Sequence, residues 1–179
     1  TLHIDVFEPR TRRTRGKRLP TLLYFHGGGF GFEAAPHHKK LMSVYAKRAD
    51  CRVVCPDYGL LPDAVYPAPR NDARLASSWL QKTYGDMPYA VGGDSAGGAI
   101  ASYVMADAEV TPRLAMLLYP VTDSEMKTES MKKYTDTPVW NAVNNRCMWE
   151  KYLANGDDRE ASPMQMTLPE RLPDVYIET

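Results

Sequence analysis

A serine lies between two glycines in the segment Gly93-Asp94-Ser95-Ala96-Gly97. The segment follows a short apolar run and opens a predicted helix, so the serine sits on a strand-to-helix turn. A turn this tight strains the serine backbone, and side chains at 93 or 97 would collide with the neighbouring strand or helix. The pattern is typical of a nucleophile elbow, which exposes the hydroxyl at a helix N-terminus that favours developing negative charge. A phosphate-binding loop is the alternative, but the segment matches neither G-x-G-x-x-G nor G-x-x-x-x-G-K-[ST].

A second glycine-rich segment, His26-Gly27-Gly28-Gly29-Phe30, directly follows another apolar run. When a serine attacks an ester carbonyl, the carbonyl oxygen becomes an alkoxide, and backbone N–H groups must already point at it. Three glycines allow that approach because they carry no side chains to interfere. A glycine triplet alone is weak support, but together with the serine elbow it favours acyl transfer from an ester.

Strands and helices alternate along most of the chain. The apolar patterns predict strands at 2–7, 21–25, 52–55, 89–91, 114–118 and 173–179, and helices at 36–49, 71–84 and 99–108. Strands separated by helices of this length form right-handed βαβ units and a mostly parallel sheet with helices on both faces. The predicted fold class is therefore α/β, with both glycine-rich segments at the ends of buried strands.

The alternation breaks at residues 121–172, which are polar, rich in methionine and loop-like. One helix is predicted here, with Thr137 as N-cap, Pro138 as its first residue and an end near Leu153. Three side chains of this helix could line an apolar pocket but more often fill a core: Trp140, Met148 and Trp149. We expect residues 121–172 to form a loop-and-helix excursion from the sheet, close to the ligand pocket, within a single domain of residues 1–179.

The composition is that of an ordinary globular protein and points to a small or neutral partner. The 179 residues are 44% hydrophobic and 25% charged, which excludes a disordered or coiled-coil chain. Basic and acidic residues number 22 each, so no net charge favours nucleic acid. No apolar run approaches the ~18 residues of a membrane span. Three cysteines without metal-ligand spacing indicate buried thiols in a reducing compartment, the cytoplasm, and we expect no metal site.

These motifs together resemble the hormone-sensitive-lipase-like family of α/β-hydrolases. The matching segments, in family order, are His26–Phe30, Asp57-Tyr58 with Leu60, Pro62-Asp63, Tyr66–Ala68 with Asp72, Gly92–Gly98 and Tyr119-Pro120. The resemblance implies that Ser95 is the nucleophile and that the amides of Gly28, Gly29 and Ala96 form an oxyanion hole. It implies that His26 structures the glycine loop. The implied activity is hydrolysis of short-chain carboxylic esters through an acyl-enzyme, without a cofactor.

The chain departs from the family pattern at two points. Gly59 replaces the arginine of the family's D-Y-R-L motif, so a structural ion pair is expected to be missing or replaced. The family's acid and histidine follow the serine, whereas the four histidines of this chain all precede it: His3, His26, His37 and His38. We therefore expect a sheet truncated before its last strands, and no activity from these 179 residues alone.

The sequence also leaves alternatives to a complete esterase triad and to an esterase function. His37 or His38 could replace the missing base, although their geometry toward Ser95 is expected to be wrong. Asp123 could act as the acid, but a turn role is favoured. A non-catalytic small-molecule-binding, receptor-like protein on the same scaffold is the alternative function. The resemblance also raises a homodimer of the full-length protein, because many family members pair through their last strand.

Overall fold

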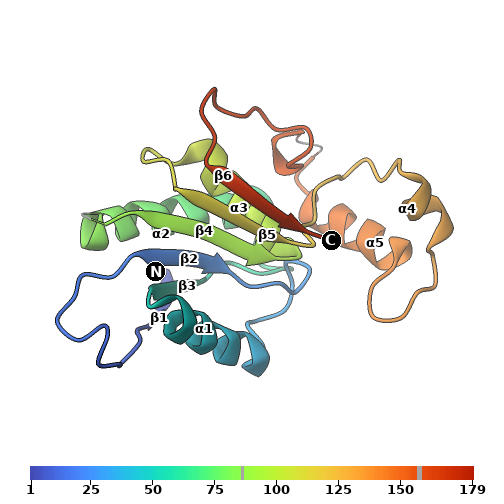
Figure 1. The fold of residues 1–179 in the computed structure, drawn as a ribbon. Helices are drawn as coiled ribbons and strands as arrows, with labels where there is room; N and C mark the ends of the chain where they lie inside the picture. The colour runs from blue at the N-terminus through green and yellow to red at the C-terminus, as the bar shows by residue number, and fades with distance from the viewer. Residues whose placement is uncertain (86, 157–158) are drawn as a thin grey trace.

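The computed structural model describes residues 1–85, 87–156 and 159–179. One six-stranded sheet runs through it in the order β1-β3-β2-β4-β5-β6 (Figure 1). Its strands are β1 (His3–Phe7), β2 (Thr21–Phe25), β3 (Arg52–Asp57), β4 (Tyr89–Asp94), β5 (Leu114–Leu118) and β6 (Asp174–Glu178). Only β1 is antiparallel to its neighbour, and all other pairs are parallel. The predicted α/β class with a mostly parallel sheet is confirmed.

Helices cover both faces of the sheet, as Figure 1 shows. Helix α1 (Pro36–Ala49) lies on one face, while α2 (Ala68–Tyr84) and α3 (Ala96–Asp107) pack together on the other. The alternation of strand side chains explains the two cores. In β2, Leu23 and Phe25 join the α2/α3 core, whereas Tyr24 between them joins the α1 core.

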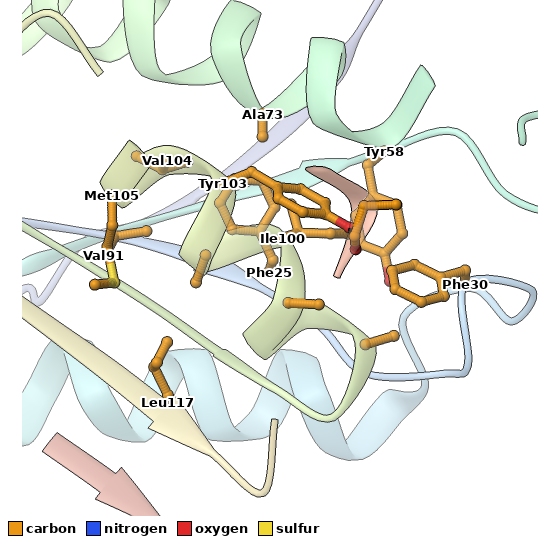
Figure 2. Close-up of a cluster of buried hydrophobic side chains, with 14 of the residues drawn as sticks. Phe25, Phe30, Tyr58, Ala73, Val91, Ile100, Tyr103, Val104, Met105 and Leu117 are labelled. Atoms are coloured by element: carbon orange, nitrogen blue, oxygen red, sulfur yellow. Dashed lines mark hydrogen bonds between the residues drawn. The ribbon is translucent and has the colours of Figure 1, made fainter. Parts of the chain in front are cut away.

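The larger core forms where α3 crosses the middle of the sheet. Figure 2 shows Phe25, Val91 and Leu117 from three adjacent strands facing Ile100 and Val104 of α3. Most of these side chains are completely buried. Because α3 begins directly after Ser95, this packing also anchors the turn that carries the serine.

The segment between β5 and β6 contains α4 (Glu129–Lys133), α5 (Ala142–Tyr152) and a short 3-10 helix, Arg159–Ala161. The 3-10 helix is tied to the α2/α3 layer by Arg70 of α2. This guanidinium donates to both carboxylate oxygens of Asp107 at 2.7 and 2.8 Å and to the carbonyl of Glu160 at 3.0 Å. Burial raises the pKa of Asp107, but the bonds from Arg70 and Arg74 outweigh it and hold the pKa below its usual value. No helix among the described residues is both long and apolar enough to cross a bilayer.

The expected start of the helix at Thr137 and Pro138 is wrong. The helix begins at Ala142, and its N-cap is Asn141, whose side chain accepts from the N–H of Asn144 at 3.0 Å. The Thr137 hydroxyl instead donates to a nearby carbonyl, and Val139 has a φ of +69°, which no α-helix allows. The start is therefore set by the asparagine cap.

Four other boundaries differ from the expected ones by two or three residues. Strand β3 continues through Pro56 to Asp57 rather than ending at Cys55. Strand β4 continues to Asp94 rather than ending at Val91, and α3 begins at Ala96 rather than Ala99. Helix α2 starts at Ala68 instead of Asn71. The shifts of β4 and α3 leave a single residue between these two elements, so the turn is as tight as the glycine pattern requires.

Candidate active site

Ser95 is the only residue between β4 and α3, and its backbone is held in a strained conformation. Its φ of +52° and ψ of −120° lie outside the regions that a side chain normally allows. The N–H of Ser95 donates to Leu118 at 2.9 Å, and its carbonyl accepts from Gly98 and Val121, both at 3.0 Å. Ser95 is partly exposed, and its hydroxyl has no hydrogen-bond partner within the described part of the chain. The turn thus engages the serine backbone and leaves the oxygen of the side chain available.

The two glycines of the elbow sit where no side chain fits. A β-carbon at Gly93 would overlap the carbonyl of Gly97, and one at Gly97 would overlap the carbonyls of Phe25 and His26. The steric reason expected for both glycines is confirmed. The second contact also shows that the first turn of α3 lies directly against the start of the glycine loop.

Sheet register brings the two glycine-rich segments to one edge. Strands β2 and β4 are parallel neighbours, and Phe25 pairs with Gly93. The glycine loop leaves β2 one residue later, and Ser95 leaves β4 two residues later. Because parallel strands end at the same sheet edge, the loop and the serine lie side by side, as in other sites built at the carboxyl ends of strands.

The glycine loop presents free backbone donors at this edge. Gly28 and Gly29 have φ values of +135° and +56°, which glycine adopts readily. The N–H groups of Gly31 and Phe32 both donate to the carbonyl of Gly28 at 3.0 Å, closing a tight turn. Within the described residues, no hydrogen bond engages the N–H of Gly28, Gly29 or Ala96. These are the three groups expected to receive an oxyanion.

A buried phenylalanine anchors the far end of the loop. Phe30 is completely buried and stacks on Tyr152 of α5, with ring centroids 3.9 Å apart and planes 6° apart. Its carbonyl accepts from the N–H of Leu61 at 2.8 Å. The glycine loop and the segment 121–172 are thereby packed together. This packing fixes the N–H groups of the loop before any ligand binds.

His26 stabilises the base of the loop. Its Nδ1 lies 2.7 Å from the Gly27 carbonyl, and its ring stacks on Tyr58 with centroids 4.7 Å apart. The Tyr58 hydroxyl donates to the His26 carbonyl at 2.8 Å. Burial lowers the pKa of His26, so the neutral ring donates from Nδ1 to Gly27. These contacts fit the structural role that the resemblance implies.

Asp94 forms a buried network that the sequence did not reveal. One carboxylate oxygen accepts from the Tyr24 hydroxyl at 2.9 Å, and the other lies 3.4 Å from Nε2 of His38. Nδ1 of His38 accepts from the N–H of Ala35 at 3.0 Å, so Nε2 carries a proton that faces Asp94. No local pattern could have shown this, because the three residues come from β2, α1 and β4.

None of the four histidines hydrogen bonds to Ser95 in the described residues. His38 faces Asp94, His26 bonds to its own loop, and His3 lies 2.7 Å from Asp57 on the edge of the sheet. His37 is exposed beside His38. The expectation that His37 and His38 have the wrong geometry agrees with these contacts.

Two further residues behave as the sequence favoured. Asp123 accepts from the N–H of Glu125 at 3.0 Å, which is a turn role. The N–H of Gly59 donates to Asp72 at 2.8 Å, so residue 59 makes a backbone hydrogen bond to a carboxylate where the structural ion pair was expected to be missing or replaced.

The aromatic and methionine side chains of the excursion divide into two groups. Met148 and Trp149 are buried in the main core, as favoured. Trp140 is 39% exposed and lies against the glycine loop, so it belongs to the surroundings of the site.

The described residues contain no group of three or more His, Cys, Asp or Glu side chains that could hold a metal ion. Cys51 and Cys55 are buried free thiols, as expected, and burial raises the pKa of Cys55 to about 12. Cys147 is exposed, so the expectation of burial is wrong for this residue.

The sequence and the fold of this chain are similar to those of proteins named as ester hydrolases. The carboxylic ester hydrolase LipN of Mycobacterium tuberculosis is 32% identical over 85% of this chain and 44% of its own length. A probable carboxylesterase 6 of Arabidopsis thaliana is 31% identical over 88% of this chain and 54% of its own length. The structure of a Pyrobaculum calidifontis esterase matches with a TM-score of 0.84 and 27% identity, covering 98% of this chain and 61% of that one.

The chain thus spans about half the length of the curated relatives it matches. A family model described as the alpha/beta hydrolase fold matches residues 22–179, which is most of the chain. The relatives named as esterases and carboxylesterases agree with the resemblance drawn from the glycine motifs. The chain belongs to the α/β-hydrolase fold family, in its hormone-sensitive-lipase-like branch.

Proposed function

We propose that the whole protein is a serine carboxylesterase that hydrolyses short-chain esters through an acyl-enzyme on Ser95. The observation that carries the proposal is the position of this strained serine beside a loop with free N–H donors. The relatives named as esterases support the same reaction.

In the first step, Oγ of Ser95 attacks the ester carbonyl and a tetrahedral intermediate forms. Its negative oxygen would be held by the N–H groups of Gly28, Gly29 and Ala96, with the α3 dipole adding to the stabilisation. When the carbon–oxygen bond to the alcohol breaks, the alcohol leaves with a proton and Ser95 stays acylated. Water then attacks the acyl-enzyme and releases the acid.

The reaction needs a base to remove the serine proton, because a serine hydroxyl is a weak nucleophile at neutral pH. In the described residues none of the four histidines bonds to Ser95, and the contacts of His3, His26 and His38 commit their rings elsewhere. We therefore propose that the base is a histidine of the whole protein outside residues 1–179, oriented by an acid in the family order serine, acid, histidine.

A substitution of the nucleophile tests the proposal. In the whole protein, Ser95→Ala should lower kcat for p-nitrophenyl acetate by at least about 10⁴-fold, because loss of a serine nucleophile abolishes the covalent route. Ser102→Ala is the matched control, since Ser102 lies on α3, the helix that follows Ser95, and its hydroxyl donates to the Gly98 carbonyl. Wild-type turnover in a folded Ser95→Ala variant would refute the proposal.

The cellular compartment and the oligomeric state of the whole protein remain predictions. The cytoplasm is expected from cysteine usage, and a homodimer of the whole protein is expected from the resemblance.

A further inference from the structure

Trp140, from the segment between α4 and α5, lies over the glycine loop. A β-carbon built on Gly29 would be 2.9 Å from Cη2 and 3.4 Å from Cζ3 of the indole. The edge of the six-membered ring therefore rests directly on Gly29, beside the N–H groups that are free to receive an oxyanion. A side chain at residue 29 would have to displace this ring.

Several hydrogen bonds hold the tryptophan in place. Its Nε1 donates to Oδ1 of Asn145 at 3.3 Å, and Asn145 is buried in α5. Its carbonyl accepts from the Thr137 hydroxyl at 2.8 Å, and its N–H donates to Pro138 at 2.8 Å. The indole is thus oriented by its own segment and by the start of α5, so it forms a defined surface over the loop.

The exposed part of this surface is apolar. Trp140 is 39% exposed, while Val139 before it is 98% exposed and Val143 is 59% exposed. Of these side chains, Trp140 is the one that contacts the glycine loop, so its exposed ring can cover an apolar group of a ligand beside the polar reaction centre.

We propose that Trp140 is a specificity-determining residue. It limits the size of the apolar substituent of the ester that lies over Gly29. The inference rests on the proposed esterase function. An ester whose carbonyl oxygen is bound at Gly28 and Gly29 must direct one of its two substituents past the indole edge. A small group packs on the ring, whereas a long chain would have to displace it. Trp140 therefore favours short esters.

The alternative role for Trp140 is only to support the glycine loop. The two roles predict different kinetics. A misplaced loop lowers kcat/KM equally for every ester, whereas removal of the indole from the binding site changes the ratio of kcat/KM between long and short esters.

The test uses Trp140→Ala and Trp140→Phe in the whole protein, with two substrate series. In one series the acyl group of a p-nitrophenyl ester grows from acetate to octanoate, and in the other the alcohol of an acetate ester grows over the same length. In one of the series, Trp140→Ala should raise the long-to-short ratio of kcat/KM by about tenfold or more, the scale on which pocket size discriminates chain length. Trp140→Phe, which keeps a ring, should give a smaller rise.

Trp79→Ala is the matched control, because Trp79 packs against Tyr84 near the end of α2 and should leave the ratio unchanged. An unchanged ratio in both series for both Trp140 variants would overturn the inference, and so would an equal loss for all esters. If the wild-type protein hydrolyses none of the esters, the proposed function itself fails, which is distinct from an active enzyme with an unchanged ratio.

Discussion

The hydroxyl of Tyr24 donates a 2.9 Å hydrogen bond to Asp94, the residue immediately before Ser95. Both residues are buried, and the bond joins the end of β2 to the end of β4. The carboxylate also packs against Gly27, where a β-carbon would overlap one of its oxygens. Asp94 therefore lies at the junction of the glycine loop and the serine turn.

Tyr24→Phe should lower the free energy of unfolding by about 1–3 kcal/mol, because a buried carboxylate loses a donor. Tyr45→Phe is the matched control. The Tyr45 ring lies 5.9 Å from the Tyr24 ring, and its hydroxyl makes no hydrogen bond in the described residues. Urea unfolding measures both variants, and equal stability of the two would contradict a structural role for the Tyr24–Asp94 bond.

Gly28→Val should reduce kcat/KM of the whole protein by about 10²-fold or more, since one oxyanion donor is typically worth that much. The φ of Gly28 is +135°, and a β-carbon there would be 2.7 Å from the Phe32 carbonyl. Gly31→Ala is the control, because its β-carbon would meet only ordinary contacts. Near-normal kinetics in a folded Gly28→Val variant would remove this amide from the mechanism.

The stability of the fold should depend on pH through His26. Burial lowers its pKa in the folded state, so the unfolded chain binds the proton more tightly. The stabilisation is fully present above the ordinary histidine pKa of about 6.5 and declines as the pH falls below it. The free energy of unfolding should therefore fall from pH 7.5 to pH 5.

His26→Asn should reduce this slope, and His37→Asn, which keeps His26, should retain it. Urea titrations at several pH values give the slopes. A wild-type slope in the His26→Asn variant would show that His26 does not govern the pH dependence.

Residues 1–179 expressed alone should not hydrolyse an activated acetate ester above background. The physical reason is that no histidine among the described residues bonds to Ser95, so the serine lacks a base. The measurement compares this polypeptide with the whole protein under the same conditions. Equal turnover would place the base within the chain, and His37 and His38 would be the first positions to substitute.

The parts of the molecule that depend on local patterns were predictable from the sequence. The order of strands and helices follows from apolar periodicity, and the turn at Ser95 follows from its flanking glycines. The contact of Trp140 with Gly29 and the contact of His38 with Asp94 were not predictable, because each joins segments that are far apart in the chain. The helix start was missed at Thr137 because a local cap signal competed with a second one at Asn141.

The central claim is that Ser95 is the nucleophile, and covalent labelling tests it most directly. The whole protein in an active preparation is treated with an organophosphate, digested and examined by mass spectrometry, with the Ser95→Ala variant as control. The account predicts one adduct on the peptide that contains Ser95, loss of activity in proportion to labelling, and no such adduct in the variant. Loss of activity with a label on another residue and an unmodified Ser95 would contradict it.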